Sequence, residues 1–167
     1  MYDKGVSNRQ QGPKHTMRFS SAKTFGHDAG FSCAFRNWHA ASNCNRLHGY
    51  ALMVRVEFSA NALDYRSWVM DFGDVVRDVK PVLTNTFDHT VIMAADDPQK
   101  DWYEWGARTK LLRLITVEHV SVEAFAALAH ESVRLWLQGS QYHPRVTCSR
   151  VDVWEHVGNQ ASVIDHI

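Results

Sequence analysis

The sequence predicts an α+β fold in which two helices pack on an antiparallel sheet. The predicted elements follow the order strand, strand, helix, strand, helix, strand, which keeps the helices apart from the first pair of strands. Two stretches support this most directly. Residues 51–58 alternate apolar and polar side chains, and residues 121–137 repeat apolar side chains at helical spacing. A chain of 167 residues can bury the core of one domain.

The first part of the chain predicts an arm followed by strands. Residues 1–16 lack apolar periodicity, so we expect a flexible N-terminal arm before a domain at 17–167. Residues 17–25 have the composition of a strand, and residues 51–58 alternate as a half-buried strand does. After a turn, residues 67–70 predict a further short strand.

Two helices are predicted in the second part. Residues 71–84 carry valines and a leucine at helical spacing, with Pro81 predicting a kink near the end. The second helix follows Ser121, a suitable N-cap, and ends before Gly139.

Three stretches flank these helices. Residues 94–105 predict a loop or a short helical excursion, and residues 111–117 an apolar strand. Residues 145–155 alternate again and predict the last strand.

Composition narrows the class of partner. The chain is 45% hydrophobic and 22% charged, with 18 basic and 18 acidic residues, so no strong field favours nucleic acid or an anionic membrane. No apolar run reaches the roughly 20 residues that span a bilayer, and residues 1–15 lack the apolar core of a signal peptide. We therefore expect a cytoplasmic protein with a small-molecule or protein partner.

One of the three cysteines is a candidate nucleophile. Cys33, Cys44 and Cys148 show no CxxC spacing, so neither a disulfide framework nor a thiolate zinc cluster is predicted. A catalytic cysteine needs a lowered pKa, and Arg46 and His48 follow Cys44 closely enough to supply positive charge. The alternative is that Cys44 is a small buried apolar side chain.

The dipeptide Asp88-His89 is a candidate acid–base pair. A carboxylate beside an imidazole fixes its tautomer and raises its basicity. The alternative is a turn with a solvated histidine.

Metal ligands are a further possibility. His48 could ligate zinc at the start of a strand, with His27 as the preferred second ligand. For a third ligand, His39 and Cys33 remain open, as does Tyr50, which shares a strand face with His48.

Glu155 ends the last predicted strand. Its carboxylate would point to the same side as the apolar residues before it, where a partly buried acid needs partners. It could accept two N–H groups from a guanidine-like ring edge or form a salt bridge to a nearby arginine.

Taken together, these motifs resemble the 6-pyruvoyl-tetrahydropterin synthase / 6-carboxytetrahydropterin synthase family between residues 25 and 155. Residues 44–49 resemble its catalytic cysteine and zinc histidines, residues 69–73 its strand-to-helix step, and residues 87–89 its Leu-Asp-His. Residues 120–123 stand where the family has Pro-Thr-x-Glu, although residues 116–118 offer a competing register.

The resemblance implies the family's tunnelling fold, with a four-stranded antiparallel sheet and two helices on one face. It implies a lyase that converts 7,8-dihydroneopterin triphosphate to 6-carboxytetrahydropterin in the queuosine pathway. Cys44, Asp88 and His89 would be catalytic, and Glu155, Ser121 and Glu123 would bind substrate. It also implies a Zn²⁺ cofactor and a homohexamer with active sites shared between subunits.

Two positions depart from the family pattern. The third zinc histidine is Tyr50, and residues 31–35 place Phe35 where the first ligand is expected. Residues 94–110 form an insertion longer than in compact bacterial members. Three alternatives stay open: a synthase that stops at the 6-pyruvoyl product, a pterin- or purine-binding protein without metal chemistry, and a cysteine hydrolase using Cys44 and His89.

Overall fold

The computed structural model describes residues 17–165. The predicted arm at residues 1–16 lies outside this part of the chain, as do residues 166 and 167.

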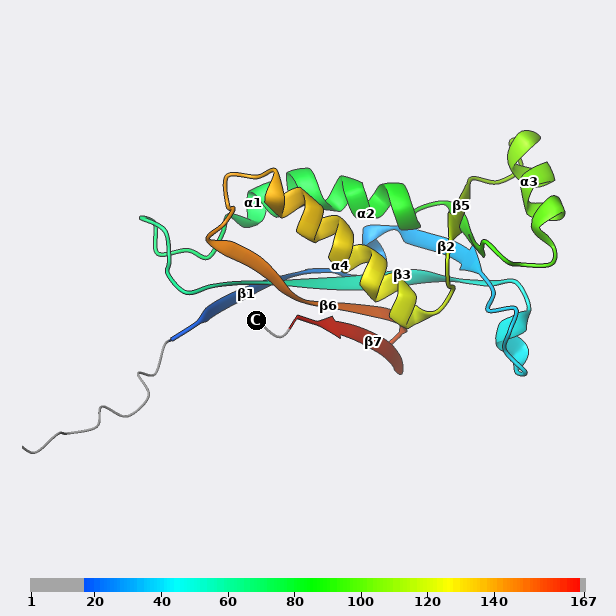
Figure 1. Cartoon of the computed structure of the whole chain (residues 1–167), viewed down its shortest axis with the longest axis horizontal. Helices are drawn as coiled ribbons and strands as arrows, with labels where there is room; N and C mark the ends of the chain where they lie inside the picture. The colour runs from blue at the N-terminus through cyan, green and yellow to red at the C-terminus, as the bar shows by residue number, and fades with distance from the viewer. Residues whose placement is uncertain (1–16, 166–167) are drawn as a thin grey trace, which may run out of the picture.

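An antiparallel sheet of four strands forms the body of the molecule. Its order is β1 (Phe19–Phe25), β3 (His48–Ala60), β6 (Val146–His156) and β7 (Asn159–Ile164). The long central strand β3 pairs with β1 on one side and β6 on the other (Figure 1). This confirms the predicted antiparallel core.

Three shorter strands extend this sheet to seven within residues 17–165. They are β2 (Phe31–Phe35), β4 (Thr90–Ala94) and β5 (Leu114–Val117). β2 pairs antiparallel with β3, whereas β4 runs parallel to both β2 and β5. The expectation of four strands was too low. β2 and β4 are short and β4 pairs with strands distant in sequence, whereas β7 forms a hairpin with β6 that the sequence pattern did not indicate.

The short strand expected at residues 67–70 was wrong. The carboxylate of Asp64 accepts hydrogen bonds from the backbone N–H groups of Arg66 and Trp68, at 2.9 and 3.0 Å. Ser67 has a positive φ of 64°. These local bonds favour a turn over an extended strand.

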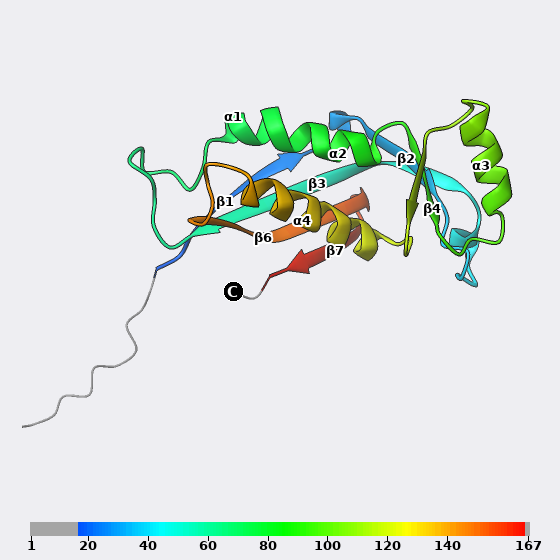
Figure 2. The same ribbon diagram turned by 45° about the horizontal axis from the view of Figure 1, so that its top comes forward.

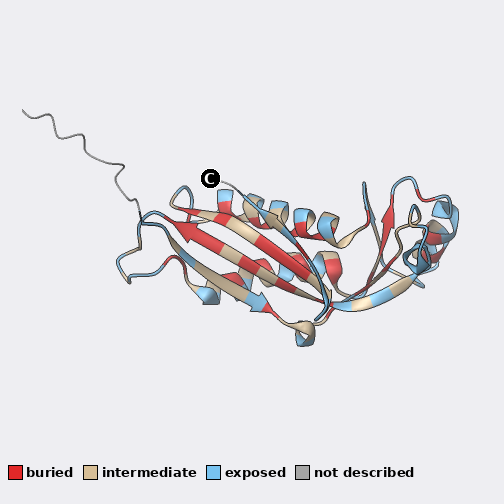
Figure 3. Cartoon of the chain, turned by 90° about the horizontal axis from the view of Figure 1, so that it is seen from below, coloured by how far each residue is buried: buried red, intermediate tan, exposed pale blue. Residues whose placement is uncertain are grey.

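The helices cover one face of the sheet. α1 (Phe72–Asp74), a π-helical turn (Val75–Val79) and α2 (Lys80–Phe87) form one continuous segment, and α4 (Val122–Gln138) lies beside it (Figure 2). Within the described residues no helix lies on the opposite face, and Figure 3 shows buried residues alternating along its strands. Helices in the described part of the chain are too short or too polar to cross a membrane.

Local chemistry explains where these helices begin. Asp71 accepts a hydrogen bond from Gly73 N at 2.8 Å, and the Ser121 hydroxyl accepts one from Ala124 N at 3.1 Å, as N-caps do. The expected kink at Pro81 takes the form of the π-helical turn that ends just before it. Proline has no N–H to donate, so the wider turn accommodates it.

The insertion forms α3 (Lys100–Arg108), as the helical alternative predicted. A buried ion pair just before this helix attaches the insertion to the end of β2. Arg36, just after β2, donates to both carboxylate oxygens of Asp97 at 2.8 and 2.5 Å. The Asp97 side chain is fully buried. Burial acts to raise the pKa of Asp97, but hydrogen bonds from Arg36 and from Gln99 N outweigh it, so the pKa is lowered.

Asp97→Asn should therefore destabilise the fold, by about 3–5 kcal/mol, because it leaves the Arg36 guanidinium without its charged partner. Since the folded pKa of Asp97 is depressed, its contribution should be present above the unfolded pKa and lost as pH falls through the folded pKa. Urea unfolding between pH 7 and pH 3 measures both effects. The exposed Asp101→Asn is the control; equal stability of the two variants would contradict the assignment.

Candidate active site

Three aromatic rings meet where β2 ends and β3 begins. The strand register places Phe35 opposite His48, and Cys33 opposite Tyr50. Ring centroids are 4.9 Å apart for Phe35 and His48, 5.7 Å for His48 and Tyr50, and 6.1 Å for Phe35 and Tyr50. Phe125 of α4 packs against Phe35 at 4.9 Å. We call Phe35, His48 and Tyr50 the aromatic trio.

The tautomer of His48 follows from one hydrogen bond. Its Nδ1 lies 2.7 Å from the carbonyl oxygen of Arg46. A carbonyl oxygen only accepts, so Nδ1 carries the proton and the neutral ring has its lone pair on Nε2.

The other proposed metal ligands lie elsewhere. His27 Nδ1 donates to the carbonyl oxygen of Ala51 at 2.5 Å. Ala51 lies three residues beyond His48 on the same strand, which is about 10 Å away. Its Nε2 is buried without a hydrogen-bond partner among the described residues. His39 stacks on Trp38 and contacts Asp96 at 3.2 Å.

These side chains do not fit the zinc site that the resemblance implies. Such a centre needs three protein ligands, whereas the aromatic trio offers one imidazole nitrogen, one phenol and a hydrocarbon ring. Burial, and then the charge of Glu155, raise the pKa of the Cys33 thiol to about 12, so in the absence of a metal this thiol is protonated near neutral pH. Within residues 17–165, no three His, Cys, Asp or Glu side chains are grouped closely enough to hold a metal.

Glu155 lies at the end of β6, where the strand pairing with β7 is irregular between Trp154 and His156. The only side-chain hydrogen bond to its carboxylate among residues 17–165 comes from the amide of Asn159, at 3.3 Å. No arginine or lysine of the described chain forms a salt bridge with it. The carboxylate therefore has accepting capacity left for a ligand.

Asp88 and His89 are in contact, as an acid–base pair requires. His89 Nδ1 lies 2.8 Å from Asp88 Oδ1, and Asp88 also accepts from Ser32 N at 3.5 Å. The His89 side chain is 86% exposed. Its backbone has a positive φ of 52°, a strained conformation for a non-glycine residue and one often found at functional sites.

An open hollow of about 550 Å³ lies beside this pair. His89 and Arg113 line it, together with Gly49 and Tyr50 of β3. Its volume falls in the range of small-molecule sites. Gly49 is required here, since a Cβ atom would lie 2.8 Å from the carbonyl oxygen of Cys33 on the paired strand. No local pattern in the sequence pointed to Arg113, which reaches the hollow because β5 pairs with β4.

Cys44 is exposed in a short turn (Asn43–Asn45) between β2 and β3. Its backbone carbonyl accepts from Asn37 N at 2.9 Å. The turn follows the end of β2, whereas Asp88 contacts Ser32 near the start of that strand. Within one chain, then, the described contacts do not join the thiol to the acid–base pair.

The proposed substrate residues at α4 fall at the helix start. Ser121 caps the helix through its hydroxyl, and Glu123 is exposed in the first turn. In the competing register, Thr116 belongs to β5 instead. The structure thus favours residues 120–123 as the segment that begins the helix.

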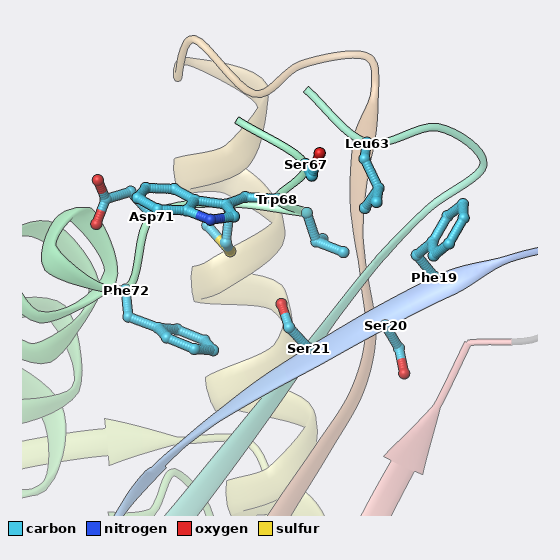
Figure 4. A pocket seen from close by; sticks show the side chains of 10 residues that line it. Phe19, Ser20, Ser21, Leu63, Ser67, Trp68, Asp71 and Phe72 are labelled. Atoms are coloured by element: carbon cyan, nitrogen blue, oxygen red, sulfur yellow. The ribbon is translucent and has the colours of Figure 1, made fainter. Parts of the chain in front are cut away.

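A second hollow, of about 430 Å³, lies far along the sheet between β1 and the segment before α1. Phe19, Trp68 and Phe72 form apolar walls (Figure 4), and Ser21 points into it from β1. The Ser21 hydroxyl has no hydrogen-bond partner among residues 17–165. None of the predicted catalytic residues lines this hollow.

Comparison with known proteins identifies the family of this chain. The profile of 6-pyruvoyl tetrahydropterin synthase matches residues 25–165. A 6-carboxy-5,6,7,8-tetrahydropterin synthase of Aquifex aeolicus is 25% identical over 162 residues, covering 87% of this chain and 97% of that protein. A second, from Rickettsia felis, is 34% identical over 59 residues, covering 35% of this chain and 42% of that protein.

Solved structures agree on the fold. An uncharacterized protein from Wolinella succinogenes superposes with a TM-score of 0.73 at 21% identity, covering 90% of this chain and 99% of that one. The 6-pyruvoyl tetrahydropterin synthase of Plasmodium vivax gives 0.61 at 14% identity, covering 89% and 99%. The predicted tunnelling fold is confirmed, and the chain belongs to the 6-pyruvoyl tetrahydropterin synthase family of pterin synthases.

Proposed function

We propose that this chain is a lyase that converts 7,8-dihydroneopterin triphosphate to 6-carboxy-5,6,7,8-tetrahydropterin, releasing triphosphate and acetaldehyde. It would act in the cytoplasm, in queuosine and 7-deazaguanine synthesis. The observation that carries the proposal is the hydrogen-bonded Asp88–His89 pair, held in strained backbone beside an open hollow. The names of the bacterial relatives support the carboxylated product.

Each retained residue has a role in this proposal. The carboxylate of Glu155 would accept two N–H groups of the pterin ring, because it has no cationic partner among the described residues. The exposed Cys44, as thiolate, would take a proton from the substrate side chain. His89, oriented by Asp88, would carry protons as triphosphate leaves.

The chemistry divides into two stages. Loss of triphosphate with two tautomerisations gives a pyruvoyl side chain, and carbon–carbon cleavage with one water then gives the carboxylate and acetaldehyde. Proton transfers assist the carbon–oxygen and carbon–carbon bond cleavages, and the overall reaction needs no external oxidant or reductant. Ser121 and Glu123, at the start of α4, would contribute to substrate binding.

The proposed site requires more than one copy of the chain. Because Cys44 and Asp88 lie toward opposite ends of β2, we propose that the thiol of one subunit meets the acid–base pair of another in a homohexamer. Light scattering of the purified protein measures this assembly.

Product analysis tests the proposal. The protein is incubated with 7,8-dihydroneopterin triphosphate, and the pterin product is identified by mass while acetaldehyde is assayed separately. The carboxylated pterin with equimolar acetaldehyde is the expected result. The pyruvoyl product without acetaldehyde would replace the carboxy assignment, and unchanged substrate would refute the lyase.

A second candidate is a pterin-binding protein that does not turn its ligand over. The aromatic trio favours it, because two rings stand where the family resemblance places zinc histidines. Tight binding of the pterin triphosphate with no product would support this candidate.

A further inference from the structure

We infer that the aromatic trio replaces a resident zinc ion in this chain, and that its backbone still holds three rings at the spacing of a three-histidine zinc site. The polar groups of a bound ligand would then contact the Nε2 of His48 and the hydroxyl of Tyr50, and they would not contact a zinc ion. The inference deepens the proposed function and rests on it only for the identity of that ligand.

Ring spacing is the first argument. A zinc–nitrogen bond of about 2.0–2.1 Å puts an imidazole centroid about 3.2 Å from the ion, so tetrahedral ligands have centroids about 5.2 Å apart. The trio has separations of 4.9, 5.7 and 6.1 Å. Three imidazoles at these positions could therefore converge on one ion.

Donor chemistry is the second argument. Phe35 has no donor atom, is only 3% exposed, and is held by an edge-to-face contact with Phe125. An ion at the trio would face this phenyl ring on one side and lose hydration there without gaining a ligand.

Side chains near the aromatic trio are the remaining candidates for zinc ligands. His156 stacks near Tyr50, with centroids 5.9 Å apart, but its Nδ1 accepts from Gly158 N at 3.1 Å. The structure groups no third His, Cys, Asp or Glu with His48 in residues 17–165. A single free imidazole nitrogen does not retain zinc against dialysis.

Zinc content tests the inference directly. The wild-type chain, Phe35→His/Tyr50→His, and the same double variant carrying His48→Ala are dialysed after zinc loading and analysed by mass spectrometry for metal. We expect far below one zinc per chain in wild type, about one in the double variant, and loss of that zinc with His48→Ala. Tetrahedral cobalt absorption in the double variant alone would identify the ligand geometry.

Each contrary result has a defined meaning. Stoichiometric zinc in the wild type would overturn the inference, and so would a folded double variant that takes up no metal. If the double variant does not fold, competition of wild type with a chromogenic chelator still decides: release of zinc at micromolar chelator supports the inference, and retention overturns it. Because these readouts need no turnover, the zinc inference can be refuted while the lyase proposal stands. In the same way, the lyase proposal can be refuted while the zinc inference stands.

Discussion

Cys44→Ala should abolish turnover of 7,8-dihydroneopterin triphosphate, by at least about 10³-fold, while leaving pterin affinity within a few-fold of wild type. The thiol is exposed in the turn between β2 and β3. Its loss should therefore remove proton abstraction without disturbing the fold or the ring site. Initial rates and equilibrium binding by fluorescence measure the two quantities separately.

The chain provides its own control for this variant. Cys148 is buried, and its burial raises the pKa of the thiol to about 12, so it cannot supply a thiolate near neutral pH. Cys148→Ala should keep the wild-type rate per folded molecule. Equal turnover by Cys44→Ala and wild type would remove Cys44 from the mechanism.

Glu155→Gln should weaken pterin binding by about 10²-fold, because an amide keeps one acceptor oxygen but loses the charge that strengthens paired N–H bonds. Glu155 has no salt bridge among the described residues, so thermal stability should change little. Calorimetric titration with a dihydropterin and thermal melting measure these effects.

A matched acid tests the specificity of this result. Glu131→Gln removes a carboxylate from the exposed face of α4, where Glu131 pairs with Arg134. It should leave pterin affinity unchanged. If Glu155→Gln bound pterin as tightly as Glu131→Gln, the ring-anchoring role would be refuted.

Local sequence patterns predicted the long elements of the fold. The apolar alternation of β3 and β6 and the helical spacing of α4 are properties of continuous segments, and they led to the right antiparallel core. β2 and β4 have five residues each, and β3 and the helical segment that ends with α2 lie between them in the chain, so their parallel pairing forms only in the folded chain. Such pairing has no signature in a short stretch of sequence.

The candidate site was also predicted where it depends on adjacent residues and missed where it depends on strand pairing. The Asp88–His89 pair was predicted from adjacent residues, and the two side chains are indeed hydrogen-bonded. The sequence also marked Phe35 and Tyr50 as departures from a zinc motif. That these residues pack on His48 could be known only from the register of β2 on β3. His27, the preferred substitute ligand, instead binds the backbone of Ala51.

The most direct test of the account is triphosphate release from 7,8-dihydroneopterin triphosphate by the oligomeric protein after dialysis against a strong chelator. We predict that triphosphate release continues, that it requires Cys44, and that acetaldehyde is formed in an equal amount. Tight pterin binding with no triphosphate release, before or after chelation, would contradict the lyase. Release that stops with chelation and returns with zinc would keep the lyase but contradict the metal-free aromatic trio.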